Sequence, residues 1–143
     1  MLKYLGRLFS STKAHLIEIA RILDFDPDVL RRMRSVKDEE CEAIFLSQIE
    51  GRCGGPVDWR GGPEDIYDIL DPCLSSDERQ CLPSVDSIEP EPPTRVVKVL
   101  NAHITKTPRA LRALGSLGDF YIILLVPRDR LAEFDHVARY WAE

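Results

Sequence analysis

The sequence has no long hydrophobic run, which argues against a transmembrane helix. Its longest apolar stretch, Phe120 to Val126, has the length of a buried strand and falls far short of the roughly 20 residues that span a bilayer. The N-terminus also lacks the continuous apolar region and the cleavage site of a secretory signal, so we expect a cytoplasmic protein. Residues 2–9 should form part of a helix that covers the core. A membrane-surface helix, which Lys3 and Arg7 would suit, is the less favoured alternative.

Metal-binding spacings are absent as well. The four cysteines form no CxxC pair and stand far apart, at Cys41, Cys53, Cys73 and Cys81. Because structural zinc sites use short spacings to bring thiolates together, we expect neither a metal nor another cofactor. Without an export signal, all four thiols should be reduced.

Known catalytic motifs are also missing. Gly115-Ser-Leu-Gly118 has the wrong order for the GxSxG turn of a serine hydrolase, and the glycines between Gly51 and Gly62 lack the lysine or the βαβ pattern of a phosphate-binding loop. The histidines stand on separate predicted helices or helix ends, at His15, His103 and His136. We therefore expect no enzymatic activity. The alternative is an enzyme whose cysteine and histidine, or whose carboxylates, meet from distant positions.

Charge is distributed unevenly along the chain. Residues 24–93 carry 18 acidic and seven basic residues, a net charge of −11, whereas the whole chain of 143 residues has a net charge of −5. An acidic surface repels phosphate backbones and attracts basic proteins, so we expect a basic protein partner and no nucleic acid. The alternative is that these acids do no more than solvate the surface.

Apolar residues at three- and four-residue spacing, with caps and stops, predict about six helices in one domain. Asp26 and Pro27 mark the start of the second helix, Ser35 can cap the third, and Thr94 can cap the fifth. The six helices should cover residues 11–23, 27–33, 36–50, 63–71, 95–104 and 128–141.

Strand formers and prolines account for the remaining residues. Residues 109–117 fit either a short helix or a strand, and we favour a strand that pairs with residues 120–126 as a hairpin, with both faces of the second strand covered. Residues 57–59 could form an edge strand or an extended loop. Residues 75–93 combine acids, serines and prolines, so we expect a long, extended and mobile connection. The fold class is thus α+β, with about six helices packed on a small antiparallel sheet.

The stretch from Asp58 to Asp68 is the most distinctive part of the sequence. It combines tryptophan, arginine and tyrosine, which are enriched at the energetic centres of protein interfaces, with several acids. The alternative is that Trp59 fills the core while Asp58 and Asp65 serve a turn and a helix cap. The expected partner-binding residues are Asp58, Trp59, Arg60, Asp65, Tyr67, Asp68, Asp71, Asp86, Glu89 and Glu91.

Two short motifs resemble a family of small uncharacterised bacterial proteins. They are Asp58-Trp59-Arg60 with Pro63-Glu64-Asp65-Ile66 after it, and the strand Asp119 to Pro127 with its closing helix. In that family, an acidic helical first half leads to an Asp-Trp-Lys stretch, and the chain ends on a Ser-Asp-Tyr strand, Val-Pro and a helix. This chain has Arg60 in place of lysine, Gly118 in place of serine, and an added proline-rich stretch at residues 82–93.

The resemblance carries no established activity. Some small acidic bacterial proteins of similar build are encoded beside secreted toxins and act as their immunity partners. The hypothesis that follows is a non-enzymatic binding protein, most specifically an immunity protein whose acidic surface masks a basic toxin. A housekeeping scaffold or interaction protein is the other non-enzymatic alternative, and the oligomeric state is left open.

Overall fold

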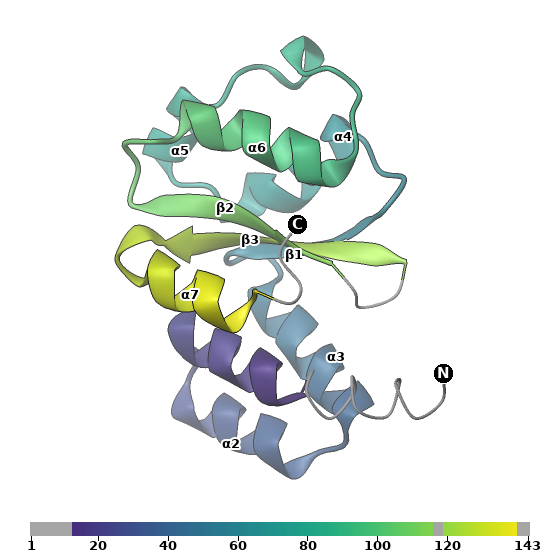
Figure 1. The fold of residues 1–143 in the computed structure, drawn as a ribbon, viewed down its shortest axis with the longest axis vertical. Helices are drawn as coiled ribbons and strands as arrows, with labels where there is room; N and C mark the ends of the chain where they lie inside the picture. Colours follow the sequence, from purple (N-terminus) through teal and green to yellow (C-terminus); the bar gives the residue numbers. More distant parts are fainter. Residues whose placement is uncertain (1–12, 116–118, 140–143) are drawn as a thin grey trace.

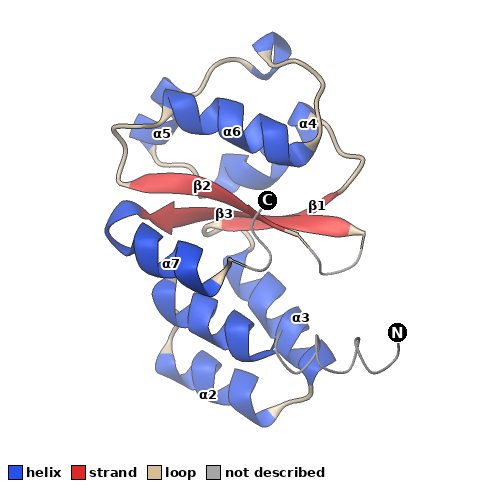
Figure 2. Ribbon diagram, in the orientation of Figure 1, coloured by secondary structure: helices blue, strands red, loops and turns tan. Residues whose placement is uncertain are grey.

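The computed structural model describes residues 13–115 and 119–139. Within these residues, seven α-helices pack against a three-stranded antiparallel sheet, which confirms the expected α+β class (Figure 2). The strands are β1 (Gly54–Asp58), β2 (Arg109–Leu114) and β3 (Phe120–Pro127), in the order β1-β3-β2. The predicted hairpin between β2 and β3 is therefore present, and β3 is the central strand.

The helices form a layer on each face of this sheet. Above it in Figure 1 lie α4, α5 and α6, and below it lie the helix at residues 13–22, α2, α3 and α7. Three short 3-10 turns, η1 (Asp71–Cys73), η2 (Val85–Ser87) and η3 (Arg128–Arg130), complete the described elements. The helix bounds are 13–22, α2 (Pro27–Ser35), α3 (Asp38–Ile49), α4 (Pro63–Leu70), α5 (Ser76–Cys81), α6 (Pro93–His103) and α7 (Leu131–Val137).

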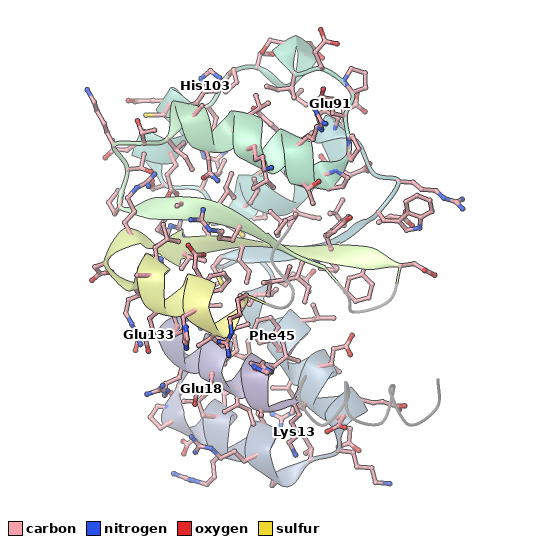
Figure 3. All side chains as sticks on the ribbon, viewed as in Figure 1. Lys13, Glu18, Phe45, Glu91, His103 and Glu133 are labelled. Carbon is pink, nitrogen blue, oxygen red and sulfur yellow. The ribbon has the colours of Figure 1, made fainter. Side chains whose placement is uncertain are left out.

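Both faces of β3 are buried, as its continuous apolar sequence predicts. Every residue from Ile122 to Val126 is fully shielded from solvent. On one face, α4 packs against β1 and α6 against β2, while α3 and α7 contact β1 and β3 from the other face. Arg21 joins the first helix to α7, since its Nη2 lies 2.6 Å from Glu18 and 3.8 Å from Glu133, two acids labelled in Figure 3.

Several helix boundaries differ from the prediction. Asp26 does cap α2, because its side chain accepts a hydrogen bond from the Asp28 N–H, but Ser35 ends α2 and does not cap α3. The N-cap of α6 is Pro92, two residues before the expected cap Thr94, because Pro93 suits the first helical position. The last helix begins with η3 and ends at Val137, with Ala138 as its C-cap, which is earlier than the predicted end near Trp141; Trp141 itself lies outside the described residues.

The prediction of an entirely extended connection over residues 75–93 is wrong. Ser75 and Glu78 form a capping box in which each side chain accepts a hydrogen bond from the other residue's backbone N–H, at 3.2 and 2.8 Å. This box starts α5, and η2 follows it. The extended prediction rested on the prolines of this region. The residues between Pro72 and Pro83 contain no proline, however, and they carry the S-x-x-E signature of a helix start.

Strand β1 begins at Gly54, three residues before the expected segment, and it is an edge strand. The Cys53 carbonyl accepts from the Leu125 N–H and the Trp59 N–H donates to the Asp119 carbonyl, so alternate residues of β1 face β3. Pro56 has the opposite orientation, so its backbone nitrogen points away from β3. Its lack of an N–H therefore removes no hydrogen bond between β1 and β3. Gly54 lies so close to β3 that an added Cβ would stand 1.9 Å from the Ile123 carbonyl oxygen.

Candidate functional site

Trp59 lies at the surface, where half of its area is exposed to solvent. The Arg60 guanidinium carbon lies 4.7 Å from the centre of the Trp59 ring, which is a cation–π arrangement. The alternative in which Trp59 fills the core is therefore wrong. The buried side of α4 consists of its own apolar residues, Ile66 and Leu70, which belong to the hydrophobic core.

A rigid turn holds the Trp59 backbone. The Asp58 side chain accepts a hydrogen bond from the Arg60 N–H at 2.8 Å, and the Asp58 carbonyl accepts one from the Gly61 N–H at the same distance. The Asp65 carboxylate accepts one from the Gly62 N–H at 2.9 Å, which caps α4. Asp58 and Asp65 thus serve the turn and the cap, as the structural alternative predicted, and they present Trp59 and Arg60 to solvent in a fixed frame.

The Tyr67 side chain links α4 to the segment that begins at Pro83. Its side chain is half-buried, and its hydroxyl donates a hydrogen bond to the Pro83 carbonyl at 2.7 Å. Burial raises the pKa of this hydroxyl, so it is un-ionised at neutral pH. Tyr67 therefore ties α4 to the start of the 83–93 segment and is less available as a contact residue than the sequence suggested.

The predicted acids have different surroundings. Asp71 is paired with Arg79 at 2.6 Å, and Glu91 lines a groove together with Arg95 and Lys98. Asp68 lies on the exposed side of α4 and lines a second groove, beside β1. Asp86 and Glu89 are exposed and have no ion-pair partner within residues 13–115 and 119–139.

The structure therefore brings part of the predicted set together. The start of α4 and the 85–90 segment line one groove, to which Asp65 and Asp86 both contribute. Trp59 and Arg60 precede this helix start in the chain and are not among the residues that line the groove. Glu64 also lines this groove, although the sequence prediction did not include it. The sequence signal for Glu64 is its position directly after Pro63, which marks the first turn of α4.

A buried ion pair is the second feature that sequence reasoning missed. The Glu78 side chain is 1% exposed, and its carboxylate accepts two hydrogen bonds from the Arg109 guanidinium, at 2.6 and 3.0 Å. Burial alone would raise the pKa of Glu78, but the bonds from Arg109 and Ser75 outweigh it and hold that pKa below its ordinary value. Arg109 also donates to the Cys73 carbonyl at 2.8 Å, so it joins β2 to η1 and α5.

The cysteines lie in surroundings that disfavour thiolates. Cys41, Cys53 and Cys73 are buried, and burial raises the pKa of each, in the case of Cys53 to about 11. A protonated thiol is a poor nucleophile and a poor metal ligand. In the described part of the chain, no group of three or more histidine, cysteine, aspartate or glutamate side chains is placed to hold a metal ion.

No helix among the described residues has both the length and the apolar character needed to cross a bilayer. Comparisons with known proteins add no assignment, because no family model, no curated protein and no solved structure matches this chain. The described residues thus form an α+β protein with helices on both faces of a three-stranded sheet.

Proposed function

We propose that this chain is a non-enzymatic protein-binding module that contacts a basic protein partner through the surface around Trp59. The observation that carries the proposal is the exposure of Trp59, half in solvent and stacked with Arg60 on a rigid turn. A large aromatic ring left in water gains free energy when a partner covers it, and tryptophan and arginine are the residues most enriched at energetic centres of interfaces.

The charges around this turn support a basic partner. Segment 51–93 carries ten acidic and three basic residues, and Glu64, Asp68, Asp86 and Glu89 have no ion-pair partner within the described ranges. Unpaired carboxylates near an exposed aromatic anchor attract and orient a cationic surface. In its most specific form, the proposal is that the partner is a secreted bacterial toxin and that this chain is its immunity protein, acting in the cytoplasm.

The raised pKa values of three buried thiols count against a cysteine nucleophile, which is one form of the enzyme alternative. A cysteine nucleophile needs a thiolate, and burial suppresses the thiolate form of three of the four cysteines. Cys81 is the exposed cysteine. Replacing Cys81 with serine should therefore leave partner binding unchanged.

The proposal is tested in two stages with the full chain. The tagged protein is first used to capture partners from cells that express it naturally, and a captured protein is identified and purified. Affinity is then measured by calorimetry for the wild type, Trp59→Ala and Val99→Ala. Val99 is a matched control, because it is a large apolar residue exposed on α6, 39% in solvent.

Trp59→Ala should weaken binding about thirtyfold, which corresponds to the roughly 2 kcal/mol typical of an interface anchor. Val99→Ala should leave the affinity within about twofold, and circular dichroism should show both variants folded. A partner that binds Trp59→Ala as tightly as the wild type would rule out the proposed surface. If the partner is a toxin, co-expression of this chain should restore growth, and Trp59→Ala should restore it poorly.

A further inference from the structure

A groove of about 470 Å³ lies between the start of α4 and the 85–90 segment. Pro63 and Val85 contribute apolar atoms to its lining, as do Ile88 and Pro90. Glu64 and Asp86 stand at the same groove and are exposed to solvent. The groove thus combines apolar walls with two carboxylates, which is the pattern that suits a side chain with a long hydrocarbon stem and a charged end.

The sign of the charge that the groove accepts follows from its polar groups. Helix starts commonly bind anions through free N–H groups, but here Pro63 has none, and the Asp65 carboxylate already accepts the hydrogen bond from the Gly62 N–H. Glu64 and Asp86 have no ion-pair partner among the described residues. Glu64 and Asp86 thus bring two unpaired negative charges to the groove, and an anion would be repelled while a cation would be attracted.

We propose that this groove receives one arginine side chain from the basic partner, and this inference rests on the function proposed above. The planar guanidinium can donate to Glu64 and Asp86 at once, while its stem packs on Pro63 and Ile88. Trp59 stands three residues before Gly62, which lines the groove, so the groove follows the proposed contact residue closely along the chain.

The test uses a defined probe, the tripeptide acetyl-Gly-Arg-Gly-amide, and its citrulline counterpart, which has nearly the same shape without the charge. Each is titrated into the isotope-labelled full chain at low salt, and backbone amide shifts are followed by NMR. The arginine tripeptide should shift Glu64, Val85, Asp86 and Ile88. It should bind about tenfold more tightly than the citrulline tripeptide, because the two carboxylates act on its charge.

Variants separate the groove from general attraction to an acidic protein. Glu64→Gln combined with Asp86→Asn should weaken arginine-tripeptide binding about tenfold. The matched control is Glu39→Gln combined with Glu40→Gln, which removes the same charge from exposed positions on α3, across the sheet, and should leave the affinity within about twofold.

Three results would overturn the inference: equal binding of arginine and citrulline tripeptides, shifts centred away from the groove, or equal loss of affinity in the two double variants. Equal or tighter binding of a lysine tripeptide would overturn the choice of arginine. Failure of the groove inference can be distinguished from failure of the proposed function. If the purified partner is sensitive to Trp59→Ala but not to Glu64→Gln with Asp86→Asn, the binding function stands and the groove inference fails. If the partner is insensitive to Trp59→Ala, the proposed surface fails.

Discussion

At the scale of single residues, two buried contacts join segments that are distant from each other in the sequence. The Gly54 backbone lies against the Ile123 carbonyl of β3, and Glu78 on α5 binds Arg109 at the start of β2. Each depends on one chemical property: the absence of a Cβ in the first case and a buried negative charge in the second. Each therefore makes a sharp prediction for a single substitution.

Gly54→Ala should destabilise the protein by about 2–4 kcal/mol, because its Cβ would overlap backbone atoms of β3 that cannot move without breaking the sheet. Urea unfolding measures the loss. The control is Gly62→Ala, since nothing lies within 4 Å of a Cβ built at Gly62, and it should cost under about 1 kcal/mol. Equal losses for the two variants would contradict the close approach of β1 to β3.

Glu78→Gln should lower the free energy of unfolding by about 2 kcal/mol at pH 7, because Arg109 loses its charged partner in a buried position. The pKa of Glu78 is lower in the folded protein than in the unfolded chain, where glutamate titrates at about 4.3. Its contribution is therefore fully present above that value and is lost as the pH falls through the folded pKa. Urea unfolding at pH 7, 5 and 3 should show the difference between wild type and variant shrinking toward pH 3. A difference that stays constant over this range would contradict the ionised pair.

At the scale of elements, the free edge of β2 is occupied by a side chain. The Asn101 amide on α6 accepts a hydrogen bond from the Leu111 N–H at 2.7 Å and donates one to the Leu111 carbonyl at 2.8 Å. It thus makes both bonds that a further strand would make at this residue. The Thr107 hydroxyl donates to the Arg109 carbonyl at 2.8 Å on the same edge. These bonds fix α6 on the sheet and leave less of the edge open to pairing with another chain.

Asn101→Ala should destabilise the protein by about 2 kcal/mol, because two backbone groups of β2 lose their partners. Amide hydrogen exchange at Leu111 should accelerate beyond what the change in global stability explains, which a purely global effect would not produce. Lys98→Ala, at an exposed position one turn earlier in α6, is the control and should change the stability by less than about 0.5 kcal/mol. Unchanged exchange at Leu111 in Asn101→Ala would contradict the edge-capping role.

At the scale of the whole molecule, the sheet divides the acidic middle of the sequence into two surfaces. Residues 24–50, with a net charge of −4, lie below the sheet in Figure 1, and residues 51–93, with a net charge of −7, lie mainly at and above it. In Figure 3, Glu91 of the second group lies toward the end of the molecule opposite Lys13. A partner that docks at Trp59 is therefore steered chiefly by the second group of acids.

Association with the partner should slow markedly as ionic strength rises, since steering acts through screened charges. Asp86→Lys combined with Glu89→Lys should lower the association rate about tenfold at low salt without unfolding the protein. Stopped-flow mixing at 20, 150 and 500 mM salt measures this rate. Glu39→Lys combined with Glu40→Lys makes the same charge change on α3 and should have a smaller effect. Rates independent of salt, or equally reduced in both double variants, would count against docking on this surface.

Local sequence signals predicted most of the elements correctly. Asp26-Pro27 and Gly62-Pro63 are local signals for the starts of α2 and α4, and the continuous apolar run of β3 predicted that both of its faces are buried. Such features depend on neighbouring residues alone, so the sequence contains them. The α5 helix was missed although its S-x-x-E box is equally local, because the surrounding prolines were given more weight.

The tertiary structure decided what depends on distant residues. The sequence placed tryptophan, arginine and acids together at 58–68, but it could not show whether Trp59 faces the core or solvent, because that depends on how completely α4 and the sheet fill the space beside it. Likewise, the groove between Glu64 and Asp86, the pairing of Glu78 with Arg109 and the capping of β2 by Asn101 join residues 10 to 31 positions apart. Contacts at such separations arise when the chain closes around a common core, and no local propensity encodes them.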